Sequence, residues 1–207
     1  MTNYLNDTEY ATKTLFDALR SEFNRLENLK AELLAKKDRL KHLQFDFTTY
    51  DQMEDYNELQ LQHKFITMAK FAQDANIPKL EKDIADTEQS IANKELSYQA
   101  IGMSILQIAK QGISKVHGSL AHCPNGRTLI TQSLKNVIWQ SRNQSIHHED
   151  GNYHNNVKNC FIDLQNDFGN DFDLNANPTA NLSTKVIDQI LNWQSYEDYY
   201  NDMMLLK

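Results

Sequence analysis

"LEKDIADTEQSIANKELSYQAIGMSILQI", residues 80–108, is the most regular stretch of this sequence. Its apolar residues recur at alternating intervals of four and three, and one threonine and one lysine interrupt the series. The repeat consists of Leu80, Ile84, Thr87, Ile91, Lys94, Tyr98, Ile101, Ile105 and Ile108. This heptad spacing is typical of a helix that packs lengthwise against another helix. We therefore expect one long helix here.

A second apolar stripe lies upstream of this repeat. It follows a similar spacing, and Lys30 and Lys37 fill the remaining positions of the seam. The stripe consists of Phe16, Leu19, Phe23, Leu26, Leu33 and Leu40. Asp7 and Thr8 are good capping residues, so we expect this helix to run from that pair to about Gln44. The two lysines predict a coiled-coil-like seam that weakens toward its end.

The segment between the two stripes predicts another helix and a turn. This helix lies near residues 51–74, and its apolar residues are Leu61, Phe65 and Met68. It should stop before Asn76-Ile77-Pro78, since a proline disfavours helix in the residue that precedes it. Residues 1–95 are therefore expected to form an elongated, coiled-coil-like helical arm.

Residues 96–207 predict an up-and-down helical bundle. Cys123-Pro124-Asn125-Gly126 is a turn, Gly169 is a left-handed stop, and residues 170–182 form a loop. One helix bears Leu129, Ile130, Leu134, Val137 and Ile138, the next bears Val157, Cys160, Phe161, Leu164 and Phe168, and the last, capped by Ser183 or Thr184, bears Val186, Ile190 and Trp193. Glycine and proline are scarce, at 6 and 3 residues, so the fold class is all-α.

Composition excludes several classes of protein. With 207 residues and 40% apolar composition the chain can bury a core as one domain, or as one domain with an appendage. No apolar run approaches the roughly 20 residues of a membrane span, and the first 15 residues lack the pattern of a signal peptide. Cys123 and Cys160 form neither a disulfide framework nor a paired-cysteine zinc pattern. We expect a cytoplasmic protein with reduced thiols and no membrane partner.

Charge is distributed unevenly along the chain. The formal net charge is -7, yet there is no Asp or Glu between Leu96 and His148. The basic residues of that stretch are Lys110, Lys115, Arg127, Lys135 and Arg142. Two interpretations remain open: a local surface that attracts phosphate, or helices that lack acids because they are buried.

The acid-free stretch ends in "WQSRNQSIHHEDG", residues 139–151. Asn143 and His147 are four residues apart and share a face of a continuous helix, whereas Arg142 and His147 diverge by roughly 140°. A shared site would need a helix end between them, the reach of the arginine, or a second copy of the chain. Arginine binds phosphate, histidine moves protons near neutral pH, and an amide orients either, so the set suits phosphodiester cleavage without a metal or cofactor.

These residues resemble the R-x4-6-H motif of HEPN domains (higher eukaryotes and prokaryotes nucleotide-binding), in the variant with asparagine after the arginine. The resemblance covers the motif and its helical context, roughly residues 96–207. It implies a four- or five-helix bundle that dimerises so that two motifs face one cleft. It also implies a metal-independent endoribonuclease of a toxin–antitoxin or antiviral defence system, with RNA as substrate and an antitoxin or other regulatory protein as partner. His147 would then transfer protons, Arg142 would stabilise the phosphorane, and Asn143 would hold the local geometry.

Other polar clusters have alternative interpretations. His117, His122 and Cys123 could bind zinc with His148 or His154, although their spacing fits no standard ligand pair. His148 and Glu149 could tune His147 or serve as plain surface residues. Trp193, Tyr196, Tyr199 and Tyr200 could stack on bases or dock a terminal helix into the bundle.

Two functions from different classes therefore remain. The first is a defence-type ribonuclease whose helical arm serves dimerisation or partner docking. The second is a non-catalytic interaction module that binds a protein or nucleotide partner, with the Arg142–His147 pair as a polar surface feature.

Overall fold

The structure is a computed structural model that describes residues 1–51 and 58–207, and the side chains of residues 1–44, 59–60 and 62–207. Residues 52–57 of the predicted second helix, and the side chain of Leu61, lie outside the described residues. The helices are α1 (Thr2–Asp51), α2 (Glu58–Asp74), α3 (Ile77–His117), α4 (Leu134–Ile146), α5 (Asn155–Phe168), α6 (Ser183–Lys185) and α7 (Tyr196–Met204). A π-helical segment, Val186–Leu191, continues α6, and two 3₁₀ turns cover Leu120–His122 and Asn170–Phe172.

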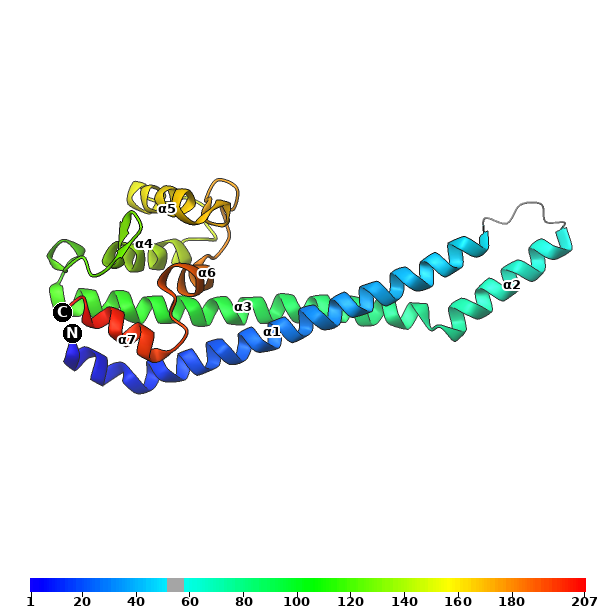
Figure 1. The fold of residues 1–207 in the computed structure, drawn as a ribbon, viewed down its shortest axis with the longest axis horizontal. Helices are drawn as coiled ribbons and strands as arrows, with labels where there is room; N and C mark the ends of the chain where they lie inside the picture. Colours follow the sequence, from blue (N-terminus) through cyan, green and yellow to red (C-terminus); the bar gives the residue numbers. More distant parts are fainter. Residues whose placement is uncertain (52–57) are drawn as a thin grey trace. The chain divides into compact units, whose positions relative to one another are not determined.

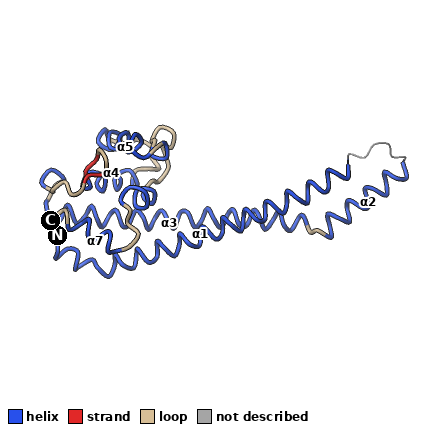
Figure 2. The backbone as a smooth tube through the Cα atoms, in the orientation of Figure 1, coloured by secondary structure: helices blue, strands red, loops and turns tan. Residues whose placement is uncertain are grey.

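The described part of the chain is all-α, as predicted, apart from one small hairpin (Figures 1 and 2). Its strands β1 (Thr128–Leu129) and β2 (Gln132–Ser133) pair antiparallel. In the described ranges no helix is both long and apolar enough to cross a membrane.

Contacts divide the chain into two units. The bundle unit consists of residues 1–23 and 96–207, and the hairpin unit consists of residues 24–95. One edge of this division, between Glu95 and Leu96, coincides with the predicted domain boundary. Residues 1–23, which the sequence assigned to the arm of residues 1–95, are grouped with the C-terminal residues instead.

The hairpin unit pairs its part of α1 antiparallel with its part of α3. Lys37 Nζ lies 2.6 Å from Glu88 Oε1, and Lys30 Nζ lies 3.7 Å from Glu95 Oε1. The two lysines that interrupt the apolar seam thus form cross-helix ion pairs, which are exposed and contribute little to stability. The predicted helical hairpin is confirmed.

The predicted ends of these helices need two corrections. The first helix begins at Thr2 rather than at Asp7-Thr8, and it continues to Asp51 rather than to Gln44. Thr8 lies inside the helix, where its hydroxyl donates to the carbonyl of Tyr4, 2.9 Å away. The early start has a packing cause, since Leu5 is fully buried and Tyr4 nearly so. The turn predicted around Asn76 is present, and α3 begins there with Pro78 in its first turn, where proline is tolerated.

The bundle unit builds one core from both ends of the chain. Leu5, Phe16 and Leu19 of α1 belong to the same apolar cluster as residues of α3, α4, α5 and α7. The ring of Phe16 lies 5.9 Å from that of Tyr199, and the hydroxyl of Thr2 lies 3.9 Å from the sulfur of Met204. Figure 1 shows α7 between the start of α1 and the end of α3. The N-terminal turns therefore complete the bundle.

Two predicted helices of the bundle unit are wrong in part. Leu129 and Ile130 do not begin the fourth helix, because they lie in the β-hairpin that precedes α4 (Figure 2). The last helix does not reach Trp193: the chain turns left-handed at Asn192, with φ 54°. A separate helix, α7, then begins at a capping box of Ser195 and Asp198. Gly169 ends α5 with a positive φ of 105°, but its ψ of 178° lies outside the left-handed helical region.

Candidate functional site

Arg142 lies on α4, and two amide side chains hold its guanidinium. Its Nε donates to Gln107 Oε1 of α3 at 2.6 Å, and its Nη1 donates to Asn143 Oδ1 at 3.1 Å. The side chain is half-buried, and burial lowers the pKa of Arg142. Among the described residues no carboxylate lies within ion-pair distance of it, so its charge is oriented but not neutralised.

A second cation lies beside Arg142. Lys110, one turn after Gln107 on α3, places its ammonium 4.3 Å from the ring centroid of Trp139 on α4. Burial lowers the pKa of Lys110, and the positive charge of Arg142 lowers it further. Lys110 likewise has no carboxylate within ion-pair distance in the described part of the chain. The α3–α4 surface thus carries two neighbouring, uncompensated positive charges.

His147 is the residue at which α4 ends. Its backbone leaves helical geometry at φ -104° and ψ 15°, while its N–H still donates to the carbonyl of Asn143 at 3.2 Å. The imidazole is exposed, and its Nδ1 lies 3.8 Å from Asp150 Oδ2. A helix end therefore lies between Arg142 and His147, which is one of the three arrangements that a shared site requires.

The structure joins Arg142 to Asn143 through a hydrogen bond but does not join the imidazole of His147 to either residue. Within residues 1–51 and 58–207 no hydrogen bond joins the His147 ring to Arg142 or to Asn143. His148 points elsewhere, since its Nδ1 lies 2.8 Å from the carbonyl oxygen of Ser145. The candidate site consequently offers a held guanidinium and a separate, solvent-accessible imidazole.

The opposite side of α4 carries a buried polar residue that the sequence did not single out. Gln144 is fully buried; its amide nitrogen donates to Tyr153 Oη at 3.1 Å and to the carbonyl of Ala180 at 2.7 Å. Its carbonyl oxygen accepts from the backbone N–H of Leu182 at 3.2 Å. Gln144 therefore ties α4 to two loops and fixes the face on which Arg142 and Asn143 reach the surface.

The histidines and cysteine considered for zinc are engaged separately. His117 Nε2 lies 2.7 Å from the carbonyl oxygen of Leu206, and His122 Nδ1 lies 3.3 Å from Ser119 Oγ. Cys123 is buried, which raises the pKa of its thiol. In the described ranges no three His, Cys, Asp or Glu residues are grouped closely enough to hold a metal ion.

The C-terminal aromatic residues pack into the core. Trp193 and Tyr199 are fully buried and meet edge to face with centroids 5.1 Å apart. The indole N–H of Trp193 donates to Asp202 Oδ2 at 2.8 Å. That carboxylate also accepts two hydrogen bonds from Arg127, at 2.7 and 2.8 Å. The docking interpretation therefore holds for these rings.

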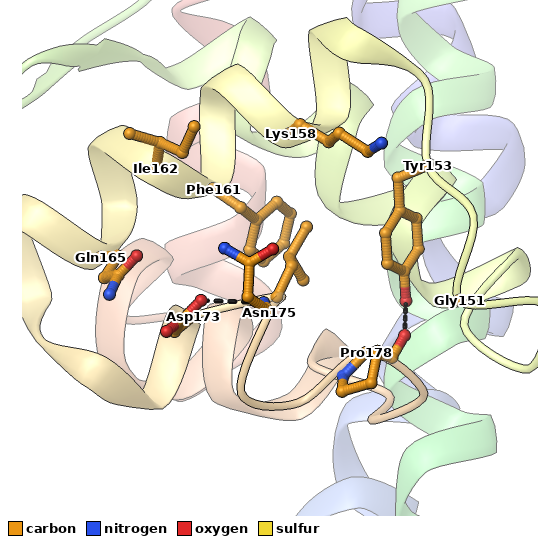
Figure 3. Close-up of a pocket in the computed structure, with 10 residues that line it drawn as sticks. Gly151, Tyr153, Lys158, Phe161, Ile162, Gln165, Asp173, Asn175 and Pro178 are labelled. Carbon is orange, nitrogen blue, oxygen red and sulfur yellow. Dashed lines mark hydrogen bonds between the residues drawn. The ribbon is translucent and has the colours of Figure 1, made fainter.

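A shallow cavity of about 290 Å³ lies beside α5 (Figure 3). Tyr153 lines one wall, where its hydroxyl donates to the carbonyl of Pro178 at 2.8 Å. On another wall, Asp173 accepts the backbone N–H of Asn175 at 2.8 Å. None of the three motif residues is among those that line this cavity. The cavity and the motif are separate features.

Comparisons with protein-family models, with curated proteins and with solved structures found no match to this chain.

Proposed function

We propose that this protein is a metal-independent endoribonuclease in which Arg142 and His147 act on the phosphodiester of RNA. One observation supports this function best. A half-buried guanidinium, oriented by Gln107 and Asn143 and left without a carboxylate, lies on the last turns of a helix that ends at an exposed histidine. Such a guanidinium suits a phosphate, since its planar fork matches two phosphate oxygens.

In the proposed reaction the ribose 2'-hydroxyl attacks the adjacent phosphorus. The O2'–P bond forms and the P–O5' bond breaks, giving a 2',3'-cyclic phosphate and a free 5'-hydroxyl. His147 takes the proton from the 2'-oxygen and delivers it to the departing 5'-oxygen, and Arg142 stabilises the negative charge that grows on the phosphorane oxygens. Asn143, which accepts a hydrogen bond from Arg142, holds the guanidinium in place.

Within the described residues no hydrogen bond joins the imidazole of His147 to Arg142, and this favours a site shared between two copies. We propose a homodimer in which Arg142 of one copy and His147 of the other meet in a common groove, as the HEPN resemblance implies. In this proposal the protein is cytoplasmic, belongs to a defence or toxin–antitoxin system, and is restrained by an antitoxin or another regulatory protein.

Cleavage of a labelled, unstructured RNA in the presence of EDTA tests the activity. We expect cyclic-phosphate ends from the wild type and a loss of at least ~100-fold in His147→Ala, the usual contribution of a positioned acid–base group. Arg142→Lys should also be impaired, because an ammonium cannot span two phosphate oxygens. The matched control is His154→Ala, which removes an exposed histidine from the start of α5.

Two outcomes would contradict the proposal. If both motif variants cleave as fast as the wild type, these residues have no part in the chemistry. If the wild type cleaves no RNA, the function is instead that of a non-catalytic module that binds a protein or nucleotide partner.

A further inference from the structure

The surroundings of Lys110 and Arg142 differ from those of two other cations in the bundle unit. Arg127 donates two hydrogen bonds to the carboxylate of Asp202. Arg20 donates to Asp188 Oδ1 at 2.9 Å. Arg142 and Lys110 are partly buried as well, yet they contact amides and an indole ring rather than a carboxylate.

Two neighbouring positive charges without a counterion repel each other. Their repulsion grows as burial removes the water that screens it, and the lowered pKa of Lys110 reflects both effects. The fold nevertheless holds both cations in place, Arg142 through Gln107 and Asn143, and Lys110 over Trp139. An anion that spans both groups would relieve the repulsion.

We propose that Lys110 and Trp139 form a subsite that binds the phosphodiester next to the one held by Arg142, on a single strand of RNA. The inference rests on the proposed function for its choice of RNA as the anion. Lys110 supplies a point charge for one phosphate, and Arg142 supplies a fork for the next. A chain with regularly spaced charges satisfies both cations at once.

Trp139 gives this subsite a second role. Its indole is half-buried on α4, where it fixes the ammonium of Lys110 through a cation–π contact. The ring therefore positions the lysine, and a strand that binds Lys110 changes the surroundings of the indole. The other tryptophan, Trp193, is fully buried and hydrogen-bonded to Asp202, so its fluorescence should not respond.

The test uses a 2'-O-methylated oligoribonucleotide, which can bind but lacks the attacking hydroxyl. Binding to the full-length protein is measured by anisotropy across salt concentrations and by tryptophan fluorescence. At about 50 mM salt, Lys110→Gln should bind about eightfold more weakly, and its plot of log K against log salt should be shallower by about 0.7, as expected for one lost contact to a single-strand phosphate.

Lys115→Gln is the matched control. It removes the same charge from the same helix, but Lys115 is exposed and lies near Tyr4, with its ammonium 5.6 Å from that ring. This variant should bind nearly as the wild type does. Lys110→Arg keeps the charge and should restore most of the binding, which separates a charge effect from a folding defect. Trp139→Phe should lose the fluorescence change.

Three results would overturn the subsite. The first is equal binding by Lys110→Gln and Lys115→Gln, and the second is no binding of the oligonucleotide by the wild type. The third is that a poly-glutamate peptide binds more tightly than the oligonucleotide and that this binding depends on Lys110, which would assign the surface to an acidic protein.

Lys110-dependent binding of RNA with no cleavage by the wild type would support the subsite and refute the ribonuclease. His147-dependent cleavage that is indifferent to Lys110 would refute the subsite alone.

Discussion

Cys160 is buried on α5 among apolar side chains, where its thiolate would be poorly solvated. Burial, with a smaller contribution from the charge of Asp163, raises the pKa of Cys160 to about 12. In the unfolded chain the thiol ionises near its ordinary value of about 9.0. Because the folded pKa is raised, the contribution of Cys160 to stability is complete below about pH 9 and is lost as the pH rises toward 12.

We therefore expect Cys160 to lower the free energy of unfolding as the pH rises from about 8.5 to about 9.5, which lies below the ordinary pKa of tyrosine. Cys160→Ala should show a flatter dependence on pH over that interval. Urea denaturation at several pH values measures both slopes. Val157→Ala, which shortens another buried side chain of α5, should keep the wild-type slope. An unchanged slope in Cys160→Ala would show that the thiol does not titrate with unfolding.

The sequence predicted the residues of the motif, but it did not predict the side chains that contact them. Arg142, Asn143 and His147 are near in sequence, so their spacing on a helix could be examined directly. Gln107 comes from a helix 35 residues earlier, and no local pattern pairs it with Arg142. Gln144 is even less accessible to prediction, since an amide on a helix usually faces water and only its loop contacts explain its burial.

The β-hairpin before α4 is the clearest departure from the expected elements. Ile130 occupies its turn with φ 55°, a conformation that a β-branched residue rarely adopts. Thr131 holds the turn: its backbone N–H donates to Asp167 Oδ2 at 3.1 Å, and its hydroxyl donates to the same oxygen. Leu129 and Ile130 fit an apolar helical face by spacing alone, so the sequence pattern predicted a helix where a tertiary contact imposes a turn.

Replacing Ile130 with glycine should stabilise the protein by about 1 kcal/mol, because glycine adopts a positive φ without strain. Little burial is lost, since the isoleucine is 63% exposed. Chemical denaturation measures the gain. Ile162→Gly serves as the contrast: that residue is also exposed but lies inside α5, so it should lose about 1 kcal/mol. Destabilisation by Ile130→Gly would mean that the side chain makes contacts that outweigh the strain.

The accuracy of the predicted helices depends on the length of the sequence pattern behind them. The heptad repeat of residues 80–108 located α3 well, because a long periodic pattern averages over local exceptions. The last helix was predicted as one piece because Val186, Ile190 and Trp193 keep helical spacing. The helical segment instead ends at Leu191, and the left-handed backbone of Asn192 redirects the chain. The indole of Trp193 then donates its hydrogen bond to Asp202.

For the whole molecule, the shared-site proposal predicts complementation between inactive variants. If Arg142 of one copy works with His147 of the other, a mixed dimer of Arg142→Ala and His147→Ala contains one intact site. Refolding an equal mixture should then restore about a quarter of the wild-type cleavage, because half of the dimers are mixed and each has one of its two sites. The measurement is RNA cleavage after co-refolding, with each variant alone as the control.

Light scattering should find a dimer, and wild-type activity per chain should fall on dilution. A monomer with full activity at nanomolar concentration would refute the shared site. Active dimers with no complementation would place both residues of a site on one copy.

The bundle unit joins residues 1–23 to residues 96–207, and the order of synthesis gives this arrangement a consequence. Residues 24–95 are continuous, so the hairpin unit can form while the ribosome is still translating the rest. Residues 1–23 can complete the core only later, since their partners include Tyr199 and Met204 of α7. During translation, the motif of residues 142–147 is therefore complete before the helices of the bundle unit have all been made. The bundle that carries Arg142 and His147 can therefore close only after α7 has been translated.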